Sequence, residues 1–347
     1  MITIKEIARQ LDMSTTTVSN VIHGKTKEVS PETIERVQRF LDQVEYVPNM
    51  TARNLAQNKS KIIGAVLKTT EDRYSHILMD PFVSEMLGGI ETAVREAGYF
   101  LMLYISDDIA EIIERITTWN ADGLLLFWMM DDDAARVHKK YRKPVVSIDT
   151  YMSRETAEQF DQDLLVNIGL EDEQGAYDAT SYLIGKGHRK IAFLSDKKDG
   201  VDQMRFRGYR RALSDAGIEY SDRYYFLMRS TRDEIDESLD RLAEKARKVT
   251  AVVCTSDMFA AMFLNACIRH GLRVPEDISF VGFDDITNIS SRLCRPRLTT
   301  VHQDIGGKGM LAANTLIGMI QGRNPSGSEI IMNTRLVERE SVADRRQ

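Results

Sequence analysis

The sequence predicts an α/β protein in two parts: a small helical domain, followed by a core of two doubly wound parallel-sheet halves. Its 347 residues suffice for two or three domains of about 150 residues each. Residues 1–60 show helical periodicity in short blocks and no strand-like alternation. From Lys61 onward, short apolar segments alternate with amphipathic helices, which is typical of the βαβ units of parallel sheets.

The N-terminal part predicts three helices around one small core. The second helix follows an N-cap at Ser14, and the third starts at Ser30-Pro31, an N-cap residue followed by proline at the first helical position. One inward apolar stripe is expected on each helix: Ile4, Ile7, Ala8 and Leu11; then Val18, Val21 and Ile22; then Ile34, Val37, Leu41 and Val44. The outward face of the second helix carries short polar side chains: Thr15, Thr16, Thr17, Ser19 and Asn20.

This polar face indicates a helix that reads DNA bases. Three consecutive threonines are poor helix formers, and an ordinary surface helix would favour Glu, Lys or Ala there. A helix, a tight turn and a second polar helix predict a helix-turn-helix whose second helix enters the major groove. The alternative is a merely solvated face of a small bundle.

The charge is distributed unevenly along the chain. The whole chain carries a net charge of −6, but residues 1–61 hold nine Lys/Arg against seven Asp/Glu, and residues 46–61 contain no acid.

The core pattern predicts two successive βαβ series. Expected strands are 62–67, 99–105, 124–128, 145–148, 165–168, 191–194, 251–254, 278–283 and 330–336, and expected helices are 82–97, 110–119, 133–141, 172–186, 204–216, 233–247, 257–270 and 304–321. Two doubly wound halves leave a cleft at the carboxyl ends of their strands, where ligands normally bind. The last helix and strand must join one half or the other, so we expect the chain to cross the cleft more than once.

Composition and motifs argue against several other classes. The longest apolar run, 124–130, is far shorter than the roughly 20 residues of a membrane span, and the N-terminus lacks a signal-peptide pattern, so we expect a cytoplasmic protein. The widely spaced Cys254, Cys267 and Cys294 predict reduced core thiols and no metal site. The motifs GxGxxG, GxxxxGK[ST], HExxH and GxSxG do not occur, so we expect no enzyme and no cofactor.

Further short motifs run along the whole chain. In the N-terminal part they are Thr3-Ile4-Lys5-Glu6-Ile7-Ala8, Met13-Ser14, Thr17-Val18-Ser19-Asn20-Val21-Ile22, Val29-Ser30, Thr33, Val37, Tyr46-Val47-Pro48-Asn49, Ala52-Arg53 and Leu55. In the core they are Lys61-Ile62-Ile63-Gly64, Asp122-Gly123-Leu124, Gly187-His188-Arg189-Lys190-Ile191-Ala192, Arg205 to Gly208, Val274-Pro275-Glu276-Asp277, Val281-Gly282-Phe283-Asp284-Asp285 and Leu298-Thr299-Thr300-Val301. With these motifs the chain closely resembles the lac repressor family (LacI/GalR) of bacterial transcription regulators.

The resemblance implies a periplasmic-binding-protein-like core and a division into three segments. These are a helix-turn-helix domain (1–48), a hinge helix and linker (49–60), and an effector-binding and dimerisation core (61–347). Within the core we expect an N-subdomain of about 61–160 plus 292–323, and a C-subdomain of about 161–291 plus 324–340. The implied function is a ligand-responsive repressor of carbohydrate-related genes, which binds a palindromic operator as a dimer and a sugar or sugar derivative in its cleft.

The resemblance also assigns roles to single residues. Asn49, Arg53 and Leu55 fall in the family's hinge helix, where Leu55 matches the leucine that wedges into the minor groove. About nine residues are too few for a stable isolated helix, so this segment should order only on DNA. The alternative for Leu55 is a linker residue that packs on the core.

Four residues resemble the family's effector contacts: Phe82, Arg205, Ser256 and Asp284. An arginine fork and a carboxylate suit a hydroxyl-rich ligand, and Phe82 matches an aromatic that stacks on it. Without the family, Arg205 is expected to be a surface ion-pair partner and Asp284 a turn or cap residue. Ser256 stands where the family often has asparagine.

Other departures from the family affect specificity and assembly. Asn20 occupies a position where many members carry arginine. Glu45 replaces a common glycine, and the glutamate would be strained if this position has a left-handed conformation. The segment 69–79 is longer than usual, which leaves the ligand class open. No heptad tail follows Ser341, so a dimer is expected instead of a tetramer. The alternative functions are an enzyme or a periplasmic-type sugar carrier built on the same core. For a repressor, the sequence is equally compatible with an effector that acts as inducer or as corepressor.

Overall fold

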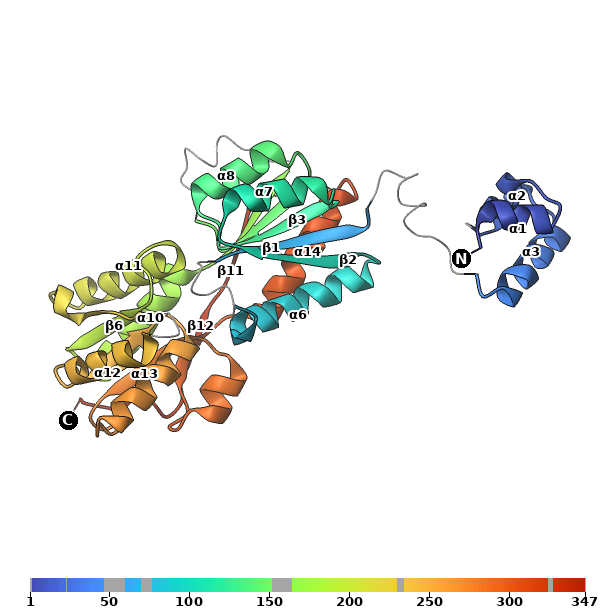
Figure 1. The fold of residues 1–347 in the computed structure, drawn as a ribbon. Coiled ribbons are helices and arrows are strands. Elements are labelled where there is room, and N and C mark those ends of the chain that lie inside the picture. The colour runs from blue at the N-terminus through green and yellow to red at the C-terminus, as the bar shows by residue number, and fades with distance from the viewer. Residues whose placement is uncertain are drawn as a thin grey trace. The chain divides into compact units, whose positions relative to one another are not determined.

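The computed structural model describes residues 2–22, 24–46, 60–69, 77–151, 164–229, 234–323 and 327–346. The chain forms two compact units, 1–60 and 61–347 (Figure 1). The predicted hinge residues Asn49, Arg53 and Leu55 lie outside the described residues.

The described part of the first unit consists of short helices, and the three α-helices among them begin at side-chain caps. They are α1 (Ile4–Gln10), α2 (Thr15–Ile22), the 3-10 turn η1 (Thr26–Glu28) and α3 (Pro31–Gln43). Thr3 and Glu6 form a reciprocal capping box on α1. The predicted caps are confirmed, because Ser14 Oγ accepts the Thr17 N–H at 3.0 Å and Ser30 Oγ accepts the Thr33 N–H at 3.3 Å.

One apolar cluster joins these helices. Its buried members are Ile7, Ala8, Leu11, Val18, Val21 and Val37, with Ile4, Ile22, Ile34 and Leu41 partly buried against them. This confirms most of the predicted inward stripes. Val44 instead ends α3 as its C-cap.

The turn after α3 carries the strain that its sequence suggests. Glu45 adopts φ +47°, and the Tyr46 N–H donates to the Leu41 carbonyl at 2.9 Å. A left-handed conformation costs a residue with a Cβ about 1–2 kcal/mol more than glycine.

We therefore expect Glu45→Gly to raise the free energy of unfolding of the first unit by about 1 kcal/mol. Denaturant-dependent hydrogen exchange of the α1–α3 amides in the full chain measures this value. Glu45→Ala keeps the Cβ and should change stability little. Lower protection in Glu45→Gly than in Glu45→Ala would contradict the assigned strain.

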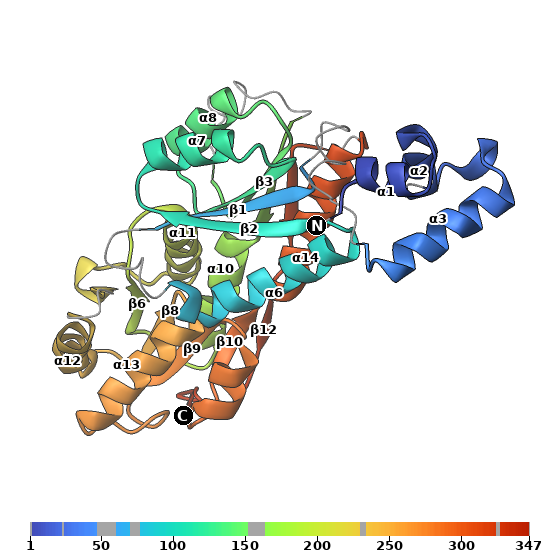
Figure 2. The ribbon, with the colours of Figure 1, turned by 45° about the vertical axis from the view of Figure 1, so that its right-hand side comes forward.

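Among the described residues, the core forms two six-stranded sheets. The first contains β1 (Ile62–Lys68), β2 (Phe100–Ser106), β3 (Gly123–Phe127), β4 (Val145–Ile148), β5 (Leu165–Leu170) and β11 (Glu329–Met332), in the parallel order β11-β5-β4-β3-β1-β2. Its accompanying helices are η2 (Ile77–Met79), α6 (Pro81–Glu96), α7 (Ile109–Thr118), α8 (Asp131–Lys140) and α14 (Ile305–Ile320). Helices α6 and α14 cover one face, and α7 and α8 cover the other (Figures 1 and 2).

The second sheet repeats this plan. Its strands are β6 (Ile191–Ser195), β7 (Tyr225–Leu227), β8 (Ala251–Cys254), β9 (Ser279–Asp284), β10 (Thr299–His302) and β12 (Arg335–Val337), in the order β12-β10-β9-β8-β6-β7 with β12 antiparallel. Its accompanying helices are α10 (Asp172–Gly185), α11 (Gly200–Asp215), η3 (Asp222–Tyr224), α12 (Ile235–Ala246), α13 (Asp257–Arg269) and the π-helical turn η4 (Asn288–Leu293). In each sheet the strand order reverses once, between β1 and β3 and between β6 and β8, so the prediction of two doubly wound halves is confirmed.

The expected subdomain boundaries are wrong at three strands. Strand β5 pairs with β4 in the first sheet although 161–291 was assigned to the C-subdomain, and β10 pairs with β9 in the second sheet although 292–323 was assigned to the N-subdomain. The expected single strand 330–336 is two strands, of which β11 joins the first sheet and β12 the second. The chain therefore crosses between the halves after β5, after β10 and after β11, which confirms more than one crossing.

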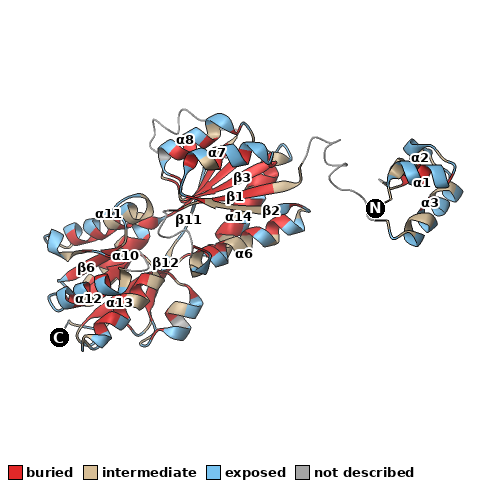
Figure 3. Ribbon diagram, viewed as in Figure 1, coloured by how far each residue is buried: buried red, intermediate tan, exposed pale blue. Residues whose placement is uncertain are grey.

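The inner strands of both sheets are buried between their helical layers, whereas the edge strands β2, β11, β7 and β12 are partly exposed (Figure 3). All three cysteines are buried and unpaired, as predicted for core thiols, and burial raises the pKa of Cys267 to about 12. Among the described residues, no helix combines the length and the apolar character needed to span a bilayer.

Candidate functional site

Helix α2 presents the predicted polar face, with unequal access along it. Thr15 and Thr16 are exposed, while Thr17, Ser19 and Asn20 are partly exposed. The Thr17 hydroxyl lies 2.8 Å from Ser14 Oγ, so it contributes to the helix cap. Thr15 and Thr16 are consequently the most accessible hydroxyls of this face.

A cavity of about 550 Å³ lies where the carboxyl ends of the two sheets meet. Its walls come from the segments after β3 and β4, the start of α6, the β6–α11 loop, and the segments after β8 and β9. All four residues expected to contact an effector line it: Phe82, Arg205, Ser256 and Asp284. Parallel sheets normally bind ligands at this position, outside the reversal of strand order.

Arg205 is the centre of a buried polar network. Its Nε donates to Asp172 Oδ1 at 2.7 Å, and its Nη1 donates to the Thr255 carbonyl and lies 3.8 Å from Asp284 Oδ1. Its guanidinium carbon lies 3.5 Å from the centroid of the Phe283 ring. The residue is 6% exposed, so the alternative of a surface ion pair is wrong. Groups of the protein therefore already bind most of the Arg205 guanidinium.

Asp284 stands at the end of β9 in an unusual backbone conformation. It adopts φ +110°, Asp285 follows at φ +59°, and Gln303 Nε2 donates to its carboxylate at 2.7 Å. Burial raises the pKa of Asp284 to about 7, although Arg205 opposes this shift. Strained residues of this kind cluster at ligand sites, where the surrounding structure holds them in place.

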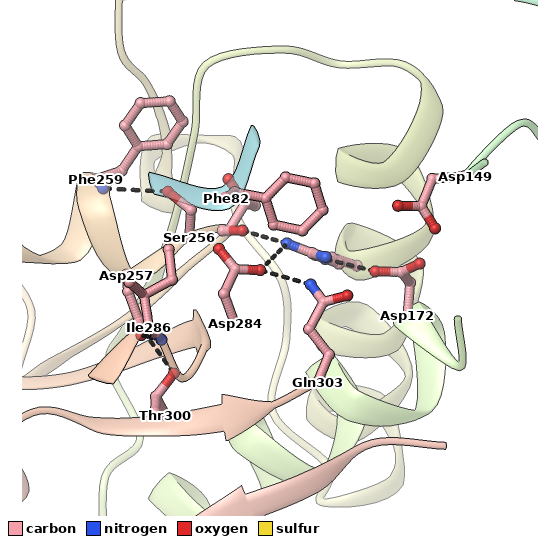
Figure 4. A network of polar contacts seen from close by, with 12 residues as sticks. Phe82, Asp149, Asp172, Ser256, Asp257, Phe259, Asp284, Ile286, Thr300 and Gln303 are labelled. Atoms are coloured by element: carbon pink, nitrogen blue, oxygen red, sulfur yellow. Dashed lines mark hydrogen bonds and ion pairs between the residues drawn. The ribbon is translucent and has the colours of Figure 1, made fainter. Parts of the chain in front are cut away.

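Asp257 fixes the loop that carries Asp284. Its carboxylate accepts the Ile286 N–H at 2.8 Å and the Thr300 hydroxyl at 2.5 Å (Figure 4). A Cβ at Gly282 would lie 2.3 Å from Asp257 Oδ1, so this carboxylate requires glycine in β9. No local sequence pattern predicts this role of Asp257.

Ser256 and Phe82 contribute different chemistry to the cavity. Ser256 Oγ accepts the Phe259 N–H at 3.1 Å as the cap of α13, which leaves its hydroxyl proton free to be donated. The rings of Phe82 and Trp128 stack on each other, with centroids 6.2 Å apart and an angle of 28° between their planes. Together these two rings form an aromatic wall on the first half of the core.

A second buried ion pair adjoins the cavity. Lys308 Nζ donates to both carboxylate oxygens of Asp149, at 2.9 and 3.1 Å, and the two side chains are 1% and 5% exposed. Asp149 lines the cavity, and Tyr151 beyond it donates to Asp172. Local sequence patterns do not predict the roles of four of these residues, because their partners lie far away along the chain: Asp149, Asp172, Trp128 and Lys308. The described residues hold no group of His, Cys, Asp and Glu arranged to bind a metal ion.

Comparisons with known proteins agree with this arrangement. Residues 3–49 match the lacI family of bacterial regulatory proteins, and residues 180–342 match the periplasmic binding protein-like domain. The HTH-type transcriptional repressor PurR of Mannheimia succiniciproducens is 31% identical over 349 residues, and the ribose operon repressor of Haemophilus influenzae is 31% identical over 347 residues. Each alignment covers 99% of both chains.

Solved structures show the same fold. A complex of the transcriptional regulator CelR with cellobiose is 26% identical, with a TM-score of 0.71 over 98% of this chain and 100% of that chain. The lac repressor dimer bound to operator and the anti-inducer ONPF has a TM-score of 0.83 over 99% of each chain at 22% identity, a likeness in fold. The predicted helix-turn-helix and periplasmic-binding-protein-like core are confirmed, and the chain belongs to the lacI family of bacterial regulatory proteins.

Proposed function

We propose that this protein is a ligand-responsive repressor that binds a palindromic operator as a homodimer and holds a sugar or sugar derivative in its cleft. The observation that carries the proposal is that one cavity is lined by residues of both halves, such as Phe82 and Arg205. A ligand that contacts both halves favours one arrangement of them over another, and only such a difference in affinity can shift a conformational equilibrium. The names of the PurR and ribose operon relatives support repression, and the CelR complex supports a sugar ligand.

The DNA contacts are proposed on two grounds. We propose that base edges or phosphates are contacted from the polar face of α2, by Thr15, Thr16, Thr17, Ser19 and Asn20, whose accessibility supports this role. Resemblance to the family supports Asn49, Arg53 and Leu55 in the hinge. We also propose that the protein acts in the cytoplasm and catalyses no reaction, since relatives aligned along the whole chain are named as repressors.

Selection of bound genomic DNA fragments by the full chain, followed by footprinting and light scattering, tests this proposal. We expect a two-fold symmetric site protected by a dimer. A monomer at micromolar concentration with undiminished DNA binding, or no sequence preference at all, would contradict it.

Asn20 provides a specific test of base reading. An asparagine amide matches adenine N6/N7 and arginine matches guanine O6/N7, so Asn20→Arg should shift preference at one operator position from adenine to guanine by about 1–3 kcal/mol. Asn20→Ala, the control, should lose the adenine preference and gain none for guanine. Binding to operators randomised at that position measures both, and identical profiles for the three proteins would remove Asn20 from the reading face.

A further inference from the structure

The charges that line the cavity are unevenly matched. Seven lining residues are aspartates, against one arginine and one lysine. The arginine, Arg205, already binds Asp172 and the Thr255 carbonyl and lies against Asp284. The lysine, Lys197, is exposed at the edge. Within the described lining, therefore, no buried cation is left for an anionic ligand.

The acidic excess is concentrated at one end of the cavity. Asp196, Asp199 and Asp202 lie within seven successive residues of the β6–α11 segment, and all three line the cavity. Burial and the charge of Asp196 raise the pKa of Asp202 to about 7. Asp196 and Asp202 are partly buried, and Asp199 is exposed. A cation placed among neighbouring carboxylates relieves their mutual repulsion, so this segment favours a positive partner over an anion.

A separate observation concerns hydrogen bonding. Gln303 is 2% exposed, and its Nε2 donates to Asp284. Its Oε1 is buried and has no hydrogen-bond partner among the described residues. Figure 4 shows this oxygen turned away from Asp284, toward the side on which Asp149 and Asp172 lie. Gln303 Oε1 can therefore accept one more hydrogen bond.

The opposite wall suits the body of a sugar-like ligand. Phe82 and Trp128 offer stacked aromatic faces from the first half of the core. Such faces pack on the apolar side of a carbon skeleton and also attract cations.

From this arrangement we propose that the effector is a polyhydroxylated molecule with a protonated amine, which meets Asp196 and Asp202 while its carbon body packs on Phe82 and Trp128. The same charges disfavour phosphorylated or carboxylated sugars. This inference rests on the proposed function, since it takes the cavity to be the effector site.

Three compounds that differ at one carbon test the proposal: 1-amino-1-deoxyglucitol, glucitol and gluconate. The first is a cation at neutral pH, like the amine of lysine, the second is neutral and the third is an anion. Calorimetry on the full chain at one ionic strength should show the amine binding about tenfold tighter than glucitol, and gluconate binding more weakly than both. The proposal would be overturned if gluconate bound as tightly as the amine. It would also be overturned if the three compounds bound equally or if none of them bound.

Variants then locate the preference. Asp202→Asn should reduce the preference for the amine over glucitol by about tenfold. Asp196→Asn should act in the same direction, which keeps the test informative if one variant fails to fold. Asp236→Asn removes an exposed acid of α12 outside the cavity and should keep the wild-type preference. An unchanged preference in both cavity variants would overturn the assignment.

The outcomes also separate this inference from the proposed function. Binding of the amine in the cavity by a chain that binds no DNA would overturn the proposed function and leave the charge preference standing. DNA binding that responds to gluconate and not to the amine would do the reverse.

Discussion

Replacing Arg205 with methionine is expected to abolish the effector response and to lower the free energy of unfolding of the core by about 3–5 kcal/mol. The structure explains why both effects occur together. Arg205 is the buried partner of Asp172 and of the Thr255 carbonyl, and it lies against Asp284, so its loss leaves buried carboxylates uncompensated. Urea unfolding and calorimetry with the effector measure the two effects.

Two comparison variants separate stability from recognition. Arg207→Met removes an exposed arginine of the same helix, which donates to Met204 Sδ, and should change neither property. Asp172→Asn combined with Arg205→Met removes one uncompensated charge and should recover part of the stability without the effector response. Wild-type effector affinity in a folded Arg205→Met protein would contradict the role proposed for the network.

Replacing Lys308 with methionine is expected to cost a similar 3–5 kcal/mol at neutral pH, because it leaves Asp149 buried without its cation. Burial already raises the pKa of Asp149, and Lys308 opposes that shift, so the variant should raise it further. A carboxyl whose folded pKa exceeds its unfolded value destabilises the fold as pH rises. The deficit of the variant should therefore be smaller at about pH 5 than at about pH 8.

The double variant Lys308→Met with Asp149→Asn gives the matched control. It removes both charges, so most of the lost stability should return, and the pH dependence should disappear. Urea unfolding at the two pH values measures both. A pH-independent deficit in Lys308→Met, unrelieved by Asp149→Asn, would show that packing and not charge explains the loss.

Local patterns predicted most elements of this fold but missed the three-residue strand β7, and long-range pairing decided which sheet each strand joins. Capping residues such as Ser14 and Ser30 and the apolar stripes placed the N-terminal helices correctly. The segment 329–337 contains two short apolar runs that resemble one strand, yet Ile330 pairs with Ile168 while Leu336 pairs with Val301. Which sheet each run joins depends on partners more than 30 residues away, and no local signal carries that choice.

The cleft was predictable only in part, for a related reason. Resemblance to the family singled out Phe82, Arg205, Ser256 and Asp284, and the structure brings all four to one cavity. Asp172 is the first residue of the expected helix 172–186, and Lys308 lies in the expected helix 304–321, so no local pattern distinguished either residue as part of the cleft. Their partners Arg205 and Asp149 lie 33 and 159 residues away, so only the folded chain reveals these pairs.

We expect a molecule bound in the cavity to change the affinity of this chain for DNA. The direct measurement is fluorescence anisotropy of a labelled operator, taken from the genomic selection, with the full chain and increasing concentrations of a compound shown by calorimetry to bind it. We expect the operator Kd to change by at least about tenfold as the cavity fills, which corresponds to about 1.4 kcal/mol of coupling. Full occupancy of the cavity with an unchanged operator Kd would contradict this coupling between effector and DNA binding.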